Sequence, residues 1–367
     1  MTEMNLLRLF CFGFDGDTLP DHIRTLLRRG LGGVILFKRN LRDLEQICAL
    51  TGEIHRQTVA PLLVGVDQEG GRVVRLPPPF LTPPPAAVLG AIDDPDLTRT
   101  VARAMGQELR AAGFNWNLAP VLDVHTNPRN PVIGDRAFSH DPDRVARMGL
   151  AVVRGLDEVG ILATAKHFPG HGETAADSHL TLPESPQTAA RWRLVEFAPF
   201  RAAIHAGIPS ILVAHMACPA LDPETASSLS RIVTTDILRT ELAFDGVVVS
   251  DDLEMGAIAA NFDIGEAAVR FLEAGGDLVL ICRNADCQRE ALDSVEAALR
   301  SGRLAASRLR ASLERLARFT SRLVSHPSTP SLDAARAIVG HADHRTLLTT
   351  VATAAARFGG PPLTMDA

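Results

Sequence analysis

Ionisable side chains gather directly at or after several short apolar runs of this sequence. The runs that carry them lie at 62–67, 116–123, 162–168, 209–215 and 246–251. The residues are Asp67, Glu69, Arg72 and Arg75; Asp123, His125 and Arg136; Lys166, His167, His171, Asp177 and His179; His215; Asp251 and Asp252. Carboxylates, imidazoles and cations brought together are the groups that acid, base and nucleophile chemistry needs.

Two of these groups predict distinct chemical roles. Asp251 ends a strongly apolar run, so its carboxylate would be held rigidly, as a covalent nucleophile requires. A cation such as Lys166 would keep it ionised. Asp177 and His179 point the same way if their segment is extended, so the Asp177 carboxylate can orient the His179 imidazole. An imidazole can donate a proton and take it back near neutral pH. The small residues and glycines of 170–176 indicate a mobile loop that delivers His179 to a bound substrate.

Several of the same residues also have a purely structural interpretation. Asp252 can cap the helix that follows it. His215 alone is typical of a hydrogen-bonded core histidine, and Asp123 of a partner for a neighbouring loop. Lys166 alone could be a solvated charge. The functional interpretation depends on convergence, since five of the eight apolar runs end in ionisable residues.

A metal centre is an alternative for the histidines. His167, His171 and His179 with Asp177 are possible ligands. However, the first apolar run lacks the HxH pattern of metal-dependent hydrolase barrels, and Phe-Pro-Gly separates His167 from His171. No GxGxxG follows the first run either. We therefore predict neither a metal nor another cofactor.

The elements that must position these residues alternate along the chain. Continuous apolar runs predict strands covered on both faces, at 6–13, 33–37, 62–67, 116–123, 162–168, 209–215, 246–251 and 276–282. Helical patterns lie between them, at 95–112, 142–159, 188–206 and 285–301, and glycines at 30, 113, 160 and 207 end helices just before strands. This alternation predicts an α/β fold, a single (β/α)8 barrel, with an open doubly wound sheet as the alternative.

The rest of the chain is predicted to support that barrel. We expect the catalytic barrel to span 1–325 and a linker, one C-terminal helix and a tail to span 326–367. The proline-rich segment 77–85 is expected to be a rigid surface loop. In a barrel the carboxyl ends of all strands share one face, which would bring the ionisable residues together.

Composition excludes several classes of protein. A net charge of −6 without a basic stripe argues against nucleic acid as a partner. No apolar run is long enough to cross a membrane, and residues 1–17 do not resemble a signal peptide. Five scattered cysteines are expected to be free thiols. We therefore expect a cytoplasmic protein. The sequence shows neither heptads nor exposed apolar faces that would give an oligomeric state, and a monomer is favoured.

Seven segments together resemble glycoside hydrolase family 3, and within it the single-domain β-N-acetylglucosaminidase branch. They are GGVILFKRN, VGVDQEGGRVVRL, NLAPVLDV, VIGDRAF, KHFPGHG, DSH and VVVSDDLEMGAI, in the expected order over residues 5–320. KHFPGHG followed by DSH at this spacing is the most specific of these signals.

The resemblance implies roles residue by residue. Asp251 matches the family nucleophile, His179 the acid/base and Asp177 its dyad partner. The residues that match those holding the nonreducing sugar are Asp67, Arg75, Arg136, Lys166 and His167. The implied reaction is retention through a glycosyl-enzyme. The implied substrate is a carbohydrate, a peptidoglycan fragment with terminal β-1,4-linked N-acetylglucosamine, processed in cell-wall recycling.

Other functions remain open at this point. The chain could be another exo-β-glycosidase acting on glucosides or xylosides, a glycoside phosphorylase, a silent sugar-binding protein or a metal-dependent hydrolase. Glu173 is a rival proton donor, and Asp252 is a rival nucleophile. Because adjacent strand residues point in opposite directions, we expect only one of Asp251 and Asp252 to face the pocket.

Overall fold

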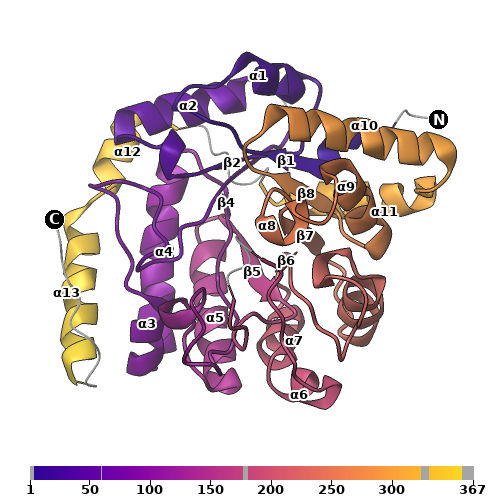
Figure 1. Ribbon diagram of the computed structural model, residues 1–367. Helices are drawn as coiled ribbons and strands as arrows, with labels where there is room; N and C mark the ends of the chain where they lie inside the picture. Colours follow the sequence, from indigo (N-terminus) through magenta and orange to yellow (C-terminus); the bar gives the residue numbers. More distant parts are fainter. Residues whose placement is uncertain (1–3, 59, 177–180, 324–329, 358–367) are drawn as a thin grey trace.

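Eight parallel strands close into a barrel in chain order (Figure 1). The computed structural model describes residues 4–58, 60–176, 181–323 and 330–357. The strands are β1 Phe10–Phe12, β2 Gly33–Leu36, β3 Leu63–Val66, β4 Trp116–Asn117, β5 Leu162–Phe168, β6 Ser210–Val213, β7 Val247–Asp252 and β8 Leu278–Ile281. The barrel closes where β1 pairs with β8. The predicted (β/α)8 barrel is confirmed.

Helices surround this barrel and connect its strands (Figure 1). They are α1 Asp21–Arg28, α2 Leu44–Arg56, α3 Ala86–Ile92, α4 Pro95–Ala111, α5 Pro142–Asp157, α6 Ala189–Leu194, α7 Phe197–His205, α8 Gly256–Ala259, α9 Ile264–Ala274, α10 Ala285–Ser301, α11 Ala306–Ser321, α12 Leu332–Ile338 and α13 Ala342–Arg357. A π-helix, Ile232–Glu241, lies between β6 and β7. Asp94 and Asp141 cap α4 and α5, each just ahead of a proline at the first helical position.

The strands are buried because helices cover their outer face and side chains fill the barrel. Phe168 at the end of β5 stacks on Phe197 of α7 with ring centroids 5.5 Å apart. The four glycines predicted to end helices all have positive φ, between 73° at Gly160 and 98° at Gly30. The left-handed conformation explains why glycine stands at these positions.

Several strands are shorter than predicted, and the largest differences are in the first and the fourth. Residues Leu6–Leu9 form a 3-10 turn, because the side chain of Asn5 accepts a hydrogen bond from the Leu7 amide and caps that turn before β1 begins. The run 116–123 pairs as a strand only at Trp116–Asn117. Pro120 has no N–H for a ladder, although Val121 still forms an isolated bridge with Lys166.

Two predicted helices are each broken in two. The pattern at 188–206 forms two helices, α6 and α7. In one continuous helix the Pro199 ring would collide with the carbonyl group four residues earlier, so the helix breaks and Pro199 lies in the first turn of α7. The C-terminal pattern forms α12 and α13, separated at Gly340, whose φ is +67°. The segment 77–85 is also not a free surface loop, since Phe80 and Leu81 are buried.

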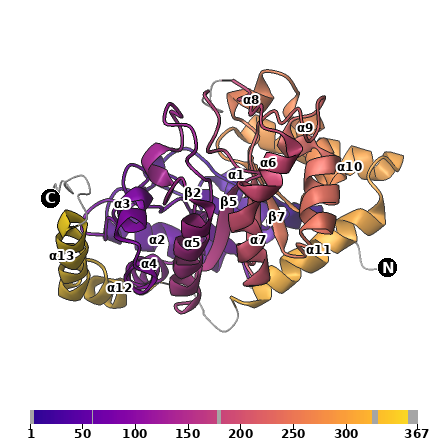
Figure 2. The ribbon, with the colours of Figure 1, turned by 90° about the horizontal axis from the view of Figure 1, so that it is seen from below.

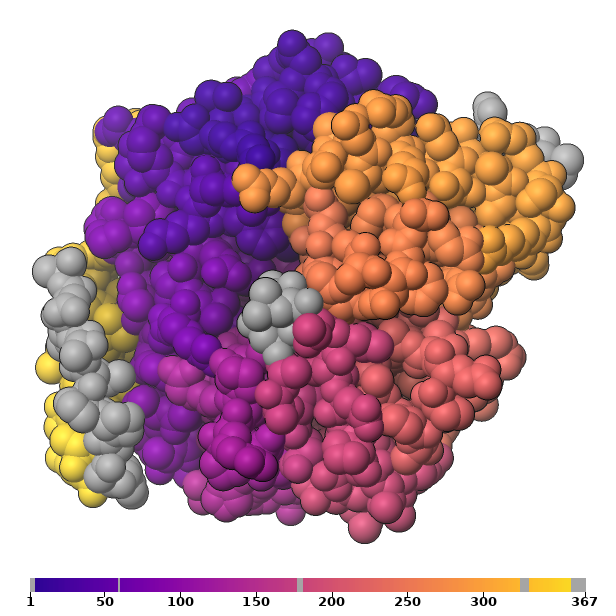
Figure 3. All heavy atoms as spheres, viewed as in Figure 1, coloured from indigo at the N-terminus to yellow at the C-terminus, as the bar shows by residue number. Residues whose placement is uncertain are grey.

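The C-terminal helices pack along one side of the barrel. Figure 2 shows α12 and α13 beside α3 and α4, and in Figure 3 the same yellow segment borders the violet part of the chain. The His344 imidazole lies 2.6 Å from the buried Glu108 carboxylate of α4, which ties α13 to the barrel. The expected boundary at 325/326 lies outside the described residues. None of the described helices is long and apolar enough to cross a membrane.

Candidate active site

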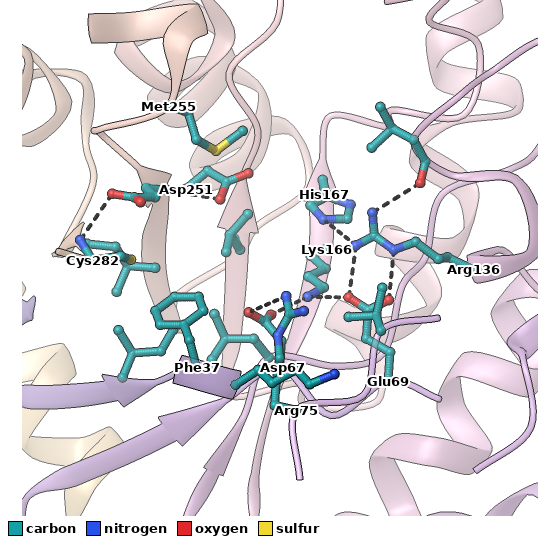
Figure 4. Close-up of a pocket in the computed structure, with 18 of the residues that line it drawn as sticks. Phe37, Asp67, Glu69, Arg75, Arg136, Lys166, His167, Asp251, Met255 and Cys282 are labelled. Carbon is teal, nitrogen blue, oxygen red and sulfur yellow. Dashed lines mark hydrogen bonds and ion pairs between the residues drawn. The ribbon is translucent and has the colours of Figure 1, made fainter. Parts of the chain in front are cut away.

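A pocket of about 830 Å³ opens at the carboxyl ends of the strands. Its walls include all five predicted sugar-binding residues and the predicted nucleophile (Figure 4). They are Asp67, Arg75, Arg136, Lys166, His167 and Asp251. Asp67 and Arg75 follow β3, Arg136 follows β4, Lys166 and His167 belong to β5, and Asp251 belongs to β7. The fold thus brings together residues that are far apart in sequence.

One wall of the pocket is a closed network of ion pairs. The Lys166 Nζ lies 2.6 Å from Asp67 Oδ1 and 2.6 Å from Glu69 Oε1, and only 3% of the lysine side chain is exposed. The Arg136 guanidinium binds both Glu69 oxygens at 2.8 Å. Arg75 lies 3.7 Å from Asp67. Each of these side chains is therefore held by at least one partner of opposite charge.

This network keeps its members charged. Burial alone would raise the pKa of the Glu69 carboxyl, but Arg136 and Lys166 outweigh burial and hold that pKa far below its usual range. Burial would lower the pKa of Lys166, but Asp67 and Glu69 outweigh it and raise the pKa. Glu69 was absent from the predicted sugar-binding residues. Its position two residues after Asp67 was the signal that could have identified it, because alternate residues of an extended segment share one side.

His167 is fixed in one orientation beside this network. Its Nδ1 lies 2.7 Å from Asp123 Oδ2, and its Nε2 lies 3.3 Å from the Arg136 guanidinium. Asp123 is fully buried and also accepts a hydrogen bond of 2.6 Å from the His171 amide. The carboxylate lets His167 donate through Nδ1 and present Nε2 to the pocket. The structural interpretation of Asp123 is therefore confirmed.

Asp251 lies across the pocket from Arg136 (Figure 4). Its Oδ1 accepts a hydrogen bond of 2.9 Å from the Asp252 amide, and within the described residues it forms no ion pair. Burial would raise the pKa of the Asp251 carboxyl, but His215, His167 and Lys166 outweigh burial and lower it. The carboxylate is therefore ionised and has no direct charged partner among the described residues, as a nucleophile requires.

His215 supports Asp251 from inside the core. Its Nδ1 lies 2.7 Å from the Ser228 hydroxyl and its Nε2 lies 3.1 Å from the Asp252 carbonyl oxygen. The side chain is fully buried, and burial lowers its pKa. His215 is therefore the hydrogen-bonded core histidine that its sequence position indicated.

The prediction that only one of the two aspartates faces the pocket is wrong. Asp252 lines the pocket together with Asp251. The pairing of β7 with β8 shifts register between Val249 and Asp252, and such irregularities re-aim side chains at strand ends. Burial raises the pKa of the Asp252 carboxyl to about 7, and the neighbouring Glu254 and Asp251 act in the same direction. Between the lowered pKa of Asp251 and neutral pH, the two adjacent acids are therefore in different protonation states.

The remaining candidates have different outcomes. Asp177 and His179 lie outside the described residues. The Glu173 carboxylate accepts a hydrogen bond from the Thr126 hydroxyl, away from the pocket lining.

Phe37 lines the pocket although the sequence did not single it out, and the Arg39 guanidinium lies 4.5 Å from its ring centroid. Across the ranges that the structure describes, no three His, Cys, Asp or Glu side chains are grouped to hold a metal ion.

Comparison with known proteins identifies close relatives. Residues 16–319 match the family model for the glycosyl hydrolase family 3 N-terminal domain. A β-hexosaminidase of Thiobacillus denitrificans is 42% identical over 288 residues, which cover 77% of this chain and 80% of that protein.

Two solved structures have the same architecture. A family 3 β-N-acetylglucosaminidase from Paenibacillus sp. FPU-7 has a TM-score of 0.92 and 38% identity, and the match covers 97% of this chain and 69% of that one. NagZ from Neisseria gonorrhoeae, solved with N-trifluoroacetyl-D-glucosamine, has a TM-score of 0.76 and 31% identity, covering 95% and 98% of the two chains.

Proposed function

This chain belongs to glycoside hydrolase family 3 and is a β-N-acetylhexosaminidase, and on that premise we propose that it removes terminal nonreducing β-1,4-linked N-acetylglucosamine with retention of configuration. The observation that carries the proposal is the placement of Asp251. An ionised carboxylate without an ion-pair partner among the described residues faces a wall of fixed polar groups across a sugar-sized pocket. Such a wall can hold a sugar while the carboxylate attacks it.

The charged wall is proposed to hold the sugar hydroxyls. Asp67 is a strong acceptor for hydroxyl donors, while Lys166, Arg136 and Arg75 donate. His167 presents its Nε2 to the same space. Because their mutual contacts fix these side chains before substrate arrives, binding costs little side-chain conformational entropy. The sugar would therefore be held with its anomeric carbon towards Asp251.

The proposed reaction has two steps. Asp251 attacks the anomeric carbon while His179 protonates the leaving oxygen, and a glycosyl-enzyme forms. Neutral His179 then takes a proton from water, whose oxygen displaces Asp251 and releases the sugar. Asp177 is proposed to orient His179 and stabilise its charged form. Two inversions at the anomeric carbon give net retention.

The wider assignment is part of the same proposal. We infer that the natural substrate is a peptidoglycan fragment, N-acetylglucosamine linked to an anhydromuramoyl sugar, in cytoplasmic cell-wall recycling. The support is the resemblance of KHFPGHG, DSH and SDD to that branch of the family. The working unit is proposed to be a monomer with a barrel at 1–325 and an extension at 326–367.

A panel of nitrophenyl β-glycosides tests the sugar assignment. We expect purified protein in phosphate-free buffer to release nitrophenol fastest from the N-acetylglucosaminide, compared with the glucoside, xyloside and N-acetylgalactosaminide. Preference for another sugar would overturn the cell-wall assignment. A rate that depends on added phosphate would indicate a phosphorylase, and no release from any glycoside would favour a sugar-binding protein.

The role of His179 is tested by varying the leaving group. His179→Ala should reduce hydrolysis of a disaccharide by ~10²-fold or more, in the range that general acid catalysis contributes, and should reduce hydrolysis of a dinitrophenyl glycoside much less at the first step. A leaving group of low pKa departs without protonation. Equal losses on the two substrates would contradict the acid role.

A further inference from the structure

The loop that follows β5 is fastened on one side to the loop that follows β4. The Asn130 side chain donates a hydrogen bond of 2.7 Å to the His171 carbonyl oxygen, and the Asn127 side chain donates one of 3.1 Å to the Glu173 carbonyl oxygen. Gly172 packs so closely that an added Cβ would lie 1.8 Å from the Val124 oxygen. These hydrogen bonds and the close packing at Gly172 hold this side of the loop against the loop after β4.

The other side of the same loop lies against α6 and α7, where some buried polar atoms have no hydrogen-bond partner among the described residues. Glu196, between these helices, is 1% exposed, and neither of its carboxyl oxygens has a hydrogen-bond partner in the described part of the chain. The buried Trp192 Nε1 is also unpartnered there. Both side chains lie against Gly170, where an added Cβ would be 2.8 Å from Glu196 Cβ and 3.5 Å from Trp192 Cζ3.

Titratable groups face Glu196 from three directions, and one of them, the Cys218 thiol, is neutral because burial raises its pKa. Arg191 of α6 has an Nη2 3.4 Å from Glu196 Oε1, Glu173 lies in the loop after β5, and Cys218 lies after β6. Burial raises the pKa of the Glu196 carboxyl to about 7, Glu173 acts in the same direction, and Arg191 opposes them. The carboxyl is therefore neutral in mildly acidic solution and becomes charged as the pH rises through neutrality.

We propose that Glu196 is a positioning residue for the loop that carries Asp177 and His179: as a neutral acid it lets the Gly170 turn pack against α6 and α7, and as a carboxylate it loosens that packing. The inference rests on the proposed function, because it concerns the loop assigned to proton transfer. Glu196 does not line the pocket, so it acts through the loop and not on the substrate.

The physical reason is the cost of burying a charge. A neutral carboxyl can remain without hydrogen bonds at a modest cost, whereas an ionised one requires donors or water. Arg191, 3.4 Å away, supplies a positive charge but no hydrogen bond to Glu196 in the described structure. Glu173 adds repulsion from the loop itself. Because Gly170 contacts Glu196, lifting the turn at Gly170 would let water reach the carboxylate, while Asn127 and Asn130 still hold the other side of the loop. Proton donation to the leaving group would then weaken above neutral pH.

The two tryptophans of the chain provide a direct readout. In protein labelled with 5-fluorotryptophan, fluorine NMR should give one signal from Trp192, beside Glu196, and one from Trp116, deep in the barrel. Assignment uses Trp192→Phe. We expect the Trp192 signal to shift with a midpoint near pH 7 while Trp116 stays constant. Glu196→Gln should remove the shift.

A second variant keeps the proposal testable if Glu196→Gln does not fold. Glu173→Gln removes the neighbouring negative charge, so the midpoint of the Trp192 shift should move to lower pH. The proposal is overturned if Trp192 does not titrate between pH 5 and 9, or if the titration persists unchanged in Glu196→Gln.

Activity then separates this inference from the proposed function. With a pKa of about 7, the neutral fraction of Glu196 falls about tenfold between pH 6 and pH 8. Glu196→Gln cannot ionise, so its kcat/KM on a disaccharide, divided by that of the wild type, should rise by up to about tenfold over the same range. On a dinitrophenyl glycoside the ratio should stay near one. A flat ratio on both substrates overturns the positioning role if His179→Ala still shows its leaving-group effect. If His179→Ala shows none, the proposed function has failed instead.

Discussion

The two walls of the pocket handle buried charge in opposite ways. On the wall from β3, β4 and β5, every acid has a cation within 4 Å, as with Glu69 between Arg136 and Lys166. On the wall from β7, Asp251 and Asp252 form no ion pair with a described residue, and their pKa values are displaced in opposite directions. Pairing makes the first wall rigid and permanently charged. The second wall keeps a carboxylate whose charge is stabilised from a distance, so no described cation is bound to the oxygens that would attack the substrate.

The largest expected effect comes from removing the unpaired charge. Asp251→Asn should lower turnover by on the order of 10⁴-fold or more, because an amide is a poor nucleophile and no other described acid takes its place. Steady-state kinetics with a nitrophenyl N-acetylglucosaminide measures this loss. The circular dichroism spectrum and unfolding midpoint serve as controls for folding. Activity within a few fold of wild type would remove Asp251 from the mechanism.

Asp252→Asn is the matched variant for that experiment. It changes the same atoms one residue along the strand, at a carboxyl that accepts hydrogen bonds from the Glu254 and Cys282 amides. We expect it to retain far more activity than Asp251→Asn. If the two variants were equally inactive, the distinction between the two acids would be wrong.

The barrel could be predicted from sequence because its signals are local. Buried parallel strands need continuous apolar runs, and glycines such as Gly160 mark where a helix must end before the next strand. The errors occur where a single backbone group decides the outcome. Pro120 shortens β4 by removing a donor, and Pro199 divides the helix at 188–206.

The site was predictable in position but not in its contacts. Residue types after strand ends placed Asp67, Lys166 and Asp251 on one face. The pairing of Glu69 with Arg136 could not be derived, because it joins side chains 67 residues apart whose distance depends on two loops. The exposure of Asp252 to the pocket was likewise missed, since the register shift between β7 and β8 leaves no signal in the sequence.

A smaller effect is expected from breaking the paired wall. Glu69→Gln removes the charge that balances Arg136 and Lys166, so kcat/KM should fall by about 10²-fold, mostly through misplaced sugar contacts. Leaving two buried cations with fewer partners should also lower the free energy of unfolding by about 3–5 kcal/mol. Kinetics on the nitrophenyl substrate and urea unfolding measure the two losses.

An exposed pair provides the control for Glu69. Asp135 and Arg72 also join the loops after β3 and β4, with nitrogen and oxygen 2.9 Å apart, but both side chains are 46% exposed. Asp135→Asn should change stability by less than about 1 kcal/mol and activity only slightly. If Asp135→Asn and Glu69→Gln had equal effects, burial would not be what gives the paired wall its importance.

The smallest effect concerns the pH dependence of stability. The folded state raises the pKa of Asp252 to about 7, so between its unfolded pKa and pH 7 the folded protein holds a proton that the unfolded chain releases. This contribution to stability is therefore lost as the pH rises towards 7, and Asp252→Asn should remove that decline. The pH dependence that Asp251 gives to stability has the opposite sign. Folding lowers the pKa of Asp251, so its contribution to stability is lost as the pH falls below about 4. Urea unfolding midpoints of the wild type and the two asparagine variants, measured from pH 3 to pH 8, should therefore diverge at opposite ends of the range. If both variants diverged from wild type at the same end, the two acids would share one environment, and the contrast between a reactive and a neutral carboxyl on β7 would fail.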